Sequence, residues 1–188
     1  MHFNTYTMAG AHIAAWLVNH PAPQAPALAA VLDGYHVHEP TVTGEDVLAL
    51  RPWAGRLREV FAADAVAAKA GLADALLVAA DCHPRLVSHG PGLPFHLHYA
   101  PVGTGLVARV RALTAAGLAH VIDGGGGTRL RACGRDGCDV VFLDTSRNGR
   151  RAFCAVRCAN QVNVASHRRR RAVAERALHI QRHDHLEA

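Results

Sequence analysis

The chain has 188 residues, 50% of them hydrophobic and 19% charged, so it can bury a core and does not have the composition of a disordered protein. The mainly apolar stretch at residues 71–80, which is interrupted by Asp74, is about half as long as a membrane-spanning helix requires. Residues 1–5 lack the basic and apolar regions of a secretory signal. We therefore expect a soluble, cytoplasmic protein that does not enter a membrane.

Charge and cysteine are both unevenly distributed along the chain. Residues 1–127 contain 7 basic and 9 acidic side chains, for a net charge of −2, whereas residues 128–188 contain 13 and 6, for a net charge of +7. Four of the five cysteines fall within the second segment: Cys133, Cys138, Cys154 and Cys158. The basic segment therefore predicts an anionic partner, and the clustered cysteines indicate a metal site.

Residues 1–30 predict a short strand, a helix and a loop. Alternation of side chains over residues 3–7 indicates the strand, and the apolar run at 11–18 indicates the helix. Three prolines within residues 21–30 remove backbone donors that a helix needs, so we expect this segment to form a loop.

A helical region is expected over residues 47–80, with its start at residues 44–46 and interruptions near Pro52 and Gly71. The helical spacing of apolar side chains predicts a buried face, made of Leu57, Val60, Phe61, Ala65 and Ala68.

A β-hairpin is expected next. The segments 85–88 and 94–99 flank a turn-rich connector, which is typical of a hairpin. Period-two alternation places His96 and His98 on the face opposite the apolar side chains. We interpret that face as the wetter one rather than as a ligand pocket.

The clearest helical periodicity covers residues 103–121. The stripe that should be buried is made of Leu106, Val110, Leu113 and Val121. Asp123 and the four glycines at 124–127 follow, and they predict a flexible break. We therefore divide the chain into a domain of residues 1–127 and a domain of residues 128–188.

The four clustered cysteines predict one structural zinc ion. Their spacing is Cys133-x4-Cys138-x15-Cys154-x3-Cys158, and two close pairs separated by a short insert suit tetrahedral Zn(II). The alternatives are four buried free thiols or a disulfide pair, which fit a reducing compartment less well. Because four thiolates leave no open position for water or substrate, we expect a structural rather than a catalytic zinc.

The residues around the cysteines predict a treble-clef-like or ribbon-like zinc finger. Residues 140–145 are a strand candidate, Asn148-Gly149 signals a hairpin turn, and residues 150–153 are the expected return strand. A helix is expected from Cys158 toward residue 178. Its buried stripe is predicted to contain Val162, Val173, Ala177 and Ile180.

Arginine side chains crowd this expected helix and the turn before it. Arginine forks match phosphate geometry and can read guanine, so the cluster predicts nucleic-acid binding. Duplex DNA is favoured over RNA, because the basic residues do not alternate with aromatic ones. A solvated charged face is the alternative interpretation. The candidate contact residues are Arg147, Arg150, Arg151, Asn160, His167, Arg168, Arg169, Arg170 and Arg171.

Four segments of the finger resemble the CGNR zinc-finger family. They are Arg129-Leu130-Arg131-Ala132-Cys133, Phe142-Leu143-Asp144-Thr145-Ser146-Arg147-Asn148, Arg151-Ala152-Phe153-Cys154 and Cys158-Ala159-Asn160-Gln161. The resemblance implies that the four cysteines are zinc ligands, and it marks Ser146, Arg147, Asn148, Arg151 and Asn160 as signature positions. The Gly and Arg that give the family its name are Ala159 and Gln161 here, and the following basic position is Asn163.

In that family the finger follows an N-terminal domain called ABATE. Residues 1–127 resemble a divergent version of it, with Ala15-Trp16-Leu17-Val18-Asn19 at the place of its early apolar–Asn motif. The family is regarded as bacterial transcription regulators. The resemblance therefore implies a stress-responsive or ligand-responsive regulator of transcription.

No other motif predicts catalysis. The pairs His36/His38 and His96/His98 have the spacing of metal ligands, but exposed or core histidines are the commoner interpretation. The neighbouring Cys82 and His83 do not form a nucleophile–base pair by adjacency alone. There is no P-loop, no G-x-G-x-x-G dinucleotide pattern and no G-x-S-x-G sequence. We expect a protein that is not an enzyme.

Together these features predict an α+β chain, with a mainly helical N-terminal domain that carries a β-hairpin and a small zinc finger that ends in a basic helix. The predicted function is a DNA-binding transcriptional regulator, whose residues 1–127 sense a small-molecule effector or mediate homodimerisation. Two alternatives use the same basic helix: a zinc-stabilised protein–protein interaction module and an RNA-binding protein.

Overall fold

The computed structural model describes residues 5–37, 41–88 and 90–184, and for 5–7 and 172–184 it describes the backbone only. The α-helices of these residues are α1 (Thr5–Asn19), α2 (Ala25–Gly34), α3 (Gly44–Ala62), α4 (Val66–Ala79), α5 (Leu106–Val121) and α6 (Val156–Asp184). The strands are β1 (Arg85–Val87), β2 (His96–His98), β3 (Leu130–Ala132) and β4 (Val141–Leu143). A π-helical turn η1 (Ile122–Gly126) and a 3-10 turn η2 (Gly127–Arg129) connect α5 to β3.

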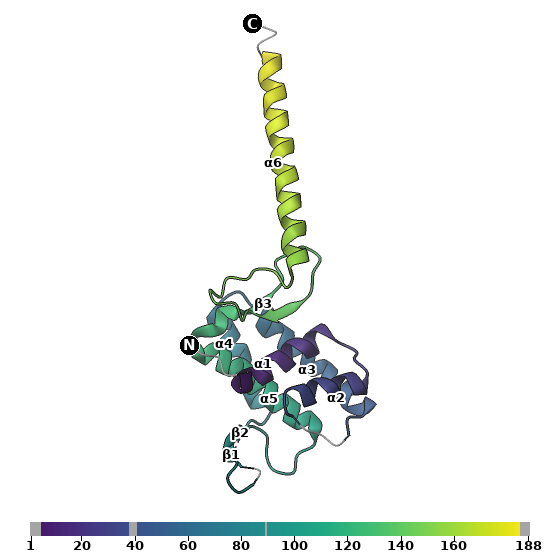
Figure 1. Cartoon of the computed structure of the whole chain (residues 1–188), viewed down its shortest axis with the longest axis vertical. Helices are drawn as coiled ribbons and strands as arrows, with labels where there is room; N and C mark the ends of the chain where they lie inside the picture. Colours follow the sequence, from purple (N-terminus) through teal and green to yellow (C-terminus); the bar gives the residue numbers. More distant parts are fainter. Residues whose placement is uncertain (1–4, 38–40, 89, 185–188) are drawn as a thin grey trace.

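The chain is α+β, as the sequence predicts. Helices α1 to α5 pack together into a helical body, and the antiparallel hairpin β1–β2 extends from one end of it (Figure 1). The second antiparallel hairpin, β3–β4, lies at the other end, and α6 projects from there away from the body (Figure 1). None of the described helices combines the length and the apolar character that a membrane-spanning segment requires.

The tightest packing in the body is the crossing of α1 over α5. A β-carbon built on Gly10 would lie 2.1 Å from the carbonyl oxygen of Leu113, and one built on Gly117 would lie 2.4 Å from the amide nitrogen of Ala11. Neither position has room for a side chain, because backbone atoms cannot move aside as a flexible side chain can. The two glycines therefore let α1 and α5 approach closely in the centre of the core.

Two predictions for residues 1–30 are wrong. Residues 5–7 belong to α1 rather than to a strand, while Phe3 lies outside the described residues. Residues 25–30 form the start of α2 rather than a loop. Pro26 lies in the first turn of that helix, where backbone N–H groups have no intrahelical partner, so the missing donor costs nothing.

Helices α3 and α4 are each continuous through the residue that was expected to interrupt them. Pro52 lies inside α3 and Gly71 inside α4, and the break falls instead at residues 63–65. Thr43 and Asp46 form a reciprocal capping box that begins α3 at the predicted place. The predicted core face is correct at Leu57, Val60 and Phe61, which are buried, and wrong at Ala65 and Ala68, which are exposed beyond the break.

Helix α5 and its stripe are confirmed, with Leu113 half-buried. The glycines after it do not form a flexible break. They lie in the turns η1 and η2, where Gly126 and Gly127 are buried. A β-carbon on Gly127 would lie 2.8 Å from Cγ1 of Val66, so this position needs glycine for its small size. Gly125 has a φ of 73°, a left-handed conformation that glycine adopts without strain.

The hairpin β3–β4 shares its core with the helical body. Leu130, Val141 and Leu143 belong to the same buried cluster as the apolar side chains of α1, α3 and α5. Lys69 of α4 is 3% exposed, and its ammonium group donates hydrogen bonds to the carbonyls of Val60, Phe61 and Leu130. Burial lowers the pKa of Lys69 from its ordinary value. The boundary between residues 127 and 128 stays a prediction, but the two segments are in close contact.

Replacing Gly10 by Ala is expected to lower the free energy of unfolding by about 1–3 kcal/mol, because the added methyl group forces α1 away from α5. The matched control is Gly71→Ala in α4, where no atom lies within 4 Å of the added carbon. That change should raise stability by about 0.5–1 kcal/mol through helix propensity. Urea unfolding followed by circular dichroism measures both. Equal stability of Gly10→Ala and the wild type would show that the crossing is not tight.

Candidate metal centre

The four clustered cysteines lie in different local structures. Cys133 directly follows β3, and Cys138 closes a turn in which Gly137 has a φ of 73°. Cys154 lies in the irregular segment before α6, and Cys158 lies in the first turn of that helix. The turn, the loop and the helix start therefore converge on one point from three parts of the chain.

The four sulfur atoms lie within 4.8 Å of one another, and they are the only group of three or more potential ligands in the described part of the chain. The sulfur of Cys138 lies 3.8 Å from that of Cys154 and 4.0 Å from that of Cys158, and the latter two are 3.6 Å apart. Zinc–sulfur bonds of about 2.3 Å in a tetrahedron place the sulfurs about 3.8 Å apart. The observed distances therefore fit one Zn(II) ion held by four thiolates.

Backbone hydrogen bonds hold the first cysteine pair. The amide of Cys133 donates to the carbonyl of Val140 over 2.9 Å, and a hydrogen bond from the backbone of Val140 lowers the pKa of Cys138 to about 7. The amide of Cys154 donates to the sulfur of Cys133 over 3.4 Å. Donors of this kind orient metal ligands and favour their thiolate form.

In the second pair, the raised pKa of Cys154 indicates that the thiolate form of the cluster needs a nearby cation. Burial, followed by the neighbouring cysteines, raises the pKa of Cys154 to about 12. Ionising all four thiols next to one another is unfavourable unless a positive charge compensates, and a divalent metal supplies that charge. The guanidinium of Arg135, 3.3 Å from the sulfur of Cys158, is a further donor beside the cluster.

The return strand predicted at residues 150–153 is wrong. Strand β4 pairs with β3 instead, with Leu143 opposite Leu130 and Val141 opposite Ala132. The predicted turn is present, since Gly149 has a φ of 60° and its amide donates to the carbonyl of Ser146.

Asp144 organises the loop that follows β4. Its buried carboxylate accepts hydrogen bonds from the amides of Ser146 at 2.9 Å and Arg151 at 2.8 Å. Burial alone would raise the pKa of Asp144, but these hydrogen bonds and the charge of Arg129 outweigh burial and lower it. The carboxylate of Asp144 thus holds the segment up to Arg151 in place, where backbone hydrogen bonds between strands were expected.

The predicted nucleic-acid contacts are all exposed, but one of them has a role within the finger. The guanidinium of Arg151 donates to the carbonyls of Phe153 and Cys154 and lies over the ring of Phe142, 5.1 Å from its centre. The exposed residues are Arg147, Arg150, Arg151, Asn160, His167, Arg168, Arg169, Arg170 and Arg171.

The buried stripe predicted for the basic helix is not found in the described residues. Val162 is half-buried and Val164 is 49% exposed. Every residue of α6 from 163 to 171 is exposed, and the helix projects away from the helical body (Figure 1). The side chains of Val173, Ala177 and Ile180 lie outside the described residues.

The histidine pairs do not assemble a second centre in the described residues. Nε2 of His96 lies 3.0 Å from Nε2 of His98, so these two side chains contact each other. Both are half-buried, whereas Leu86 and Phe95 on the hairpin are 69% and 72% exposed, so the wetter face is the apolar one. His36 has a φ of 59°, and His38 lies outside the described residues.

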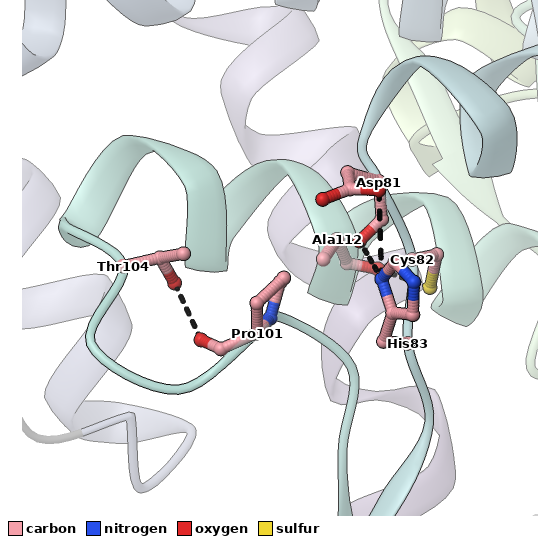
Figure 2. Close-up of polar contacts among 6 residues, drawn as sticks. All are labelled: Asp81, Cys82, His83, Pro101, Thr104 and Ala112. Atoms are coloured by element: carbon pink, nitrogen blue, oxygen red, sulfur yellow. Dashed lines mark hydrogen bonds and ion pairs between the residues drawn. The ribbon is translucent and has the colours of Figure 1, made fainter.

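Cys82 and His83 point to different partners, as Figure 2 shows. Nδ1 of His83 lies 2.9 Å from the backbone oxygen of Asp81, while the sulfur of Cys82 lies 3.9 Å from the carbonyl of Ala112. Burial raises the pKa of Cys82, which favours its neutral thiol. The arrangement does not activate Cys82 as a nucleophile.

Besides Lys69, which donates to the carbonyl of Leu130, sequence reasoning missed two further polar side chains of the helical body that contact the finger. The amide group of Asn19 pairs with both backbone groups of Val141, donating to its carbonyl over 2.8 Å and accepting from its N–H over 2.9 Å. The guanidinium of Arg58 donates to the carbonyls of Asp139 and Val18. An asparagine directly after an apolar helical run was the visible signal, but a sequence does not show which backbone it meets.

Comparison with known families agrees with the geometry of the centre. Residues 129–171 match the family model of the CGNR zinc finger, and this range includes all four cysteines. A search of curated proteins found no match. The resemblance of the finger is confirmed, and the resemblance of residues 1–127 to the ABATE domain stays a prediction.

Replacing Asp144 by Asn is expected to lower the free energy of unfolding at pH 7 by about 1–3 kcal/mol, because an amide has one acceptor oxygen for two backbone donors. The lowered pKa of Asp144 stabilises the fold above the ordinary carboxyl pKa of about 4, and this contribution is lost as the pH falls through the pKa of the folded state. The difference between wild type and Asp144→Asn should therefore shrink below pH 4. Urea unfolding across pH 3–7 measures it, and a constant difference would contradict this role.

Proposed function

We propose that the protein is a zinc-finger DNA-binding transcriptional regulator, in which α6 and the finger loop at residues 147–150 contact duplex DNA. The observation that carries the proposal is the placement of Arg168–Arg171. These four consecutive arginines are exposed on a helix that projects away from the helical body (Figure 1). A helix in this position is free to approach a large anionic surface.

The dimensions of α6 suit a duplex. Its 29 residues correspond to a length of about 43 Å at about 1.5 Å per residue. An α-helix with its side chains is about 10–12 Å wide, which is close to the width of the major groove. Because successive residues turn by about 100°, four arginines in a row surround the helix and reach both walls of a groove.

The finger loop supplies the second group of contacts. Arg147 and Arg150 are exposed on the same module as the arginines of α6, and Asn160 and His167 lie along α6 between the two groups. Arg151 has a separate role, because its guanidinium already serves the carbonyls of Phe153 and Cys154. We therefore assign Arg151 to the support of the finger and the other side chains to DNA.

The helical body is the regulatory part of this proposal. The hairpin β3–β4 packs on the same core as α1, α3 and α5, so a change in the body can reach the finger through packed side chains. Binding of a small-molecule effector or formation of a homodimer by residues 1–127 would then act on the DNA-binding module without direct contact.

Changing Arg168–Arg171 together to Ala is expected to weaken binding to duplex DNA and to make it less salt-dependent. Each lost phosphate contact should reduce the slope of log affinity against log salt by about 0.9. Fluorescence anisotropy against duplex DNA and single-stranded RNA over a salt series measures this effect. The control is Arg51→Ala on α3, which removes an exposed charge from the helical body.

Three outcomes decide the proposal. A steep slope for the wild type that becomes shallower only in the α6 variant supports it. Preference for single-stranded RNA would replace DNA by RNA as the partner. No binding at low salt with zinc present would refute nucleic-acid binding and direct the search to a protein partner.

A further inference from the structure

We propose that Asn19 and Arg58 of the helical body are positioning residues for the metal centre. They hold residues 139–141 so that Cys133 and Cys138 lie at ligand distance before the metal binds. The inference concerns metal affinity and does not rest on nucleic-acid binding.

The central residue of this segment connects both cysteines of the first pair. The carbonyl of Val140 accepts from the amide of Cys133 over 2.9 Å. Cys138 lies only two residues before Val140 in the chain, so its position also depends on the path of this segment. The position of residues 139–141 therefore constrains both cysteines of the first pair.

The residues on both sides of Val140 are held by the helical body. Nη1 of Arg58 donates to the carbonyl of Asp139 over 2.7 Å. The side chain of Asn19 pairs with the N–H and the carbonyl of Val141, in the way that a neighbouring strand would pair with it. Val140, whose two neighbours are both held, therefore has little backbone freedom of its own.

The two positioning residues also hold each other in place. Nη2 of Arg58 donates to the carbonyl of Val18 over 2.9 Å, and Val18 directly precedes Asn19 at the end of α1. A single guanidinium thus links the end of α1 to the turn that carries Cys138. Helices α1 and α3, which both pack in the main core, form the rigid base of this link.

This arrangement lowers the cost of metal binding. A short metal module without such a base orders its ligands only when the metal arrives, and the ordering subtracts from the binding free energy. Here the helical body supplies part of that order in advance. Donors beyond the ligands themselves typically change metal affinity by about 10–100-fold when they are removed.

The test compares zinc affinity in the full chain by competition with a chromophoric chelator. The variants are Asn19→Ala, Arg58→Met and the conservative Arg58→Lys. The matched control is Arg56→Met, because Arg56 lies on the same helix and donates to the carbonyl of Ala75 rather than to the finger. Urea unfolding of each protein measures the cost to global stability separately.

Asn19→Ala and Arg58→Met are expected to raise the zinc dissociation constant by about tenfold or more. Arg58→Lys should recover part of the affinity, since an ammonium group can still donate to one carbonyl, and Arg56→Met should leave it unchanged. Saturation with Co(II) should still give a four-thiolate spectrum in every variant, because the ligands themselves are intact.

Two results would overturn the proposal. One is an unchanged zinc affinity in folded Asn19→Ala and Arg58→Met. The other is an equal loss of affinity in Arg56→Met, which would show that general destabilisation causes the effect. If Arg58→Met does not fold, Asn19→Ala and Arg58→Lys decide between the same outcomes.

Discussion

The close approach of four cysteine sulfurs is the constraint on which residues 128–171 depend. Before α6, the regular structure there consists of the end of η2 and two strands of three residues each, which is too little to fold alone. A metal ion held by four sulfurs that lie within 4.8 Å of one another joins the turn after β3, the loop before α6 and the first turn of α6. The direction of the basic helix follows from that junction, because Cys158 is part of the helix itself.

The finger is also anchored from the opposite side. Leu130 and Val141 enter the core of the helical body, and Lys69 satisfies a carbonyl of β3 together with two carbonyls of α3. The polar contacts that reach the finger, those of Lys69 with Leu130, Asn19 with Val141 and Arg58 with Asp139, run from side chains of the body to backbone groups of the finger. Such contacts depend on the path of the finger backbone more than on its side chains. Substitution of exposed finger residues should therefore leave the contacts between the helical body and the finger intact.

The features that could be predicted from the sequence have a strict spacing. Two close cysteine pairs suit only a few geometries, and the apolar stripe of α5 repeats at the helical period. The features that could not be predicted depend on tertiary context. A glycine in a run of four predicts flexibility, but Gly127 is packed against Val66. A proline predicts a break in a helix, but Pro26 lies in the first turn of α2, where backbone N–H groups have no intrahelical partner.

The candidate site divides in the same way. The cysteines were found from their spacing, but Asn19, Arg58 and Lys69 belong to other parts of the chain, and each meets its backbone partner only after folding. Arg151 is predicted from its basic segment to contact a partner, and the structure adds that its guanidinium donates to nearby carbonyls of the finger. Charge predicts attraction to an anion, whereas the local geometry decides which arginines are free for it.

X-ray absorption spectroscopy of the zinc-loaded chain tests the central claim most directly, together with the zinc content of the protein. The account predicts one zinc per chain with four sulfur neighbours at about 2.3 Å and no nitrogen or oxygen neighbour. The same spectrum is expected for Cys82→Ser, because Cys82 lies outside the cluster. A nitrogen or oxygen ligand, or loss of zinc from Cys82→Ser, would contradict the four-cysteine centre.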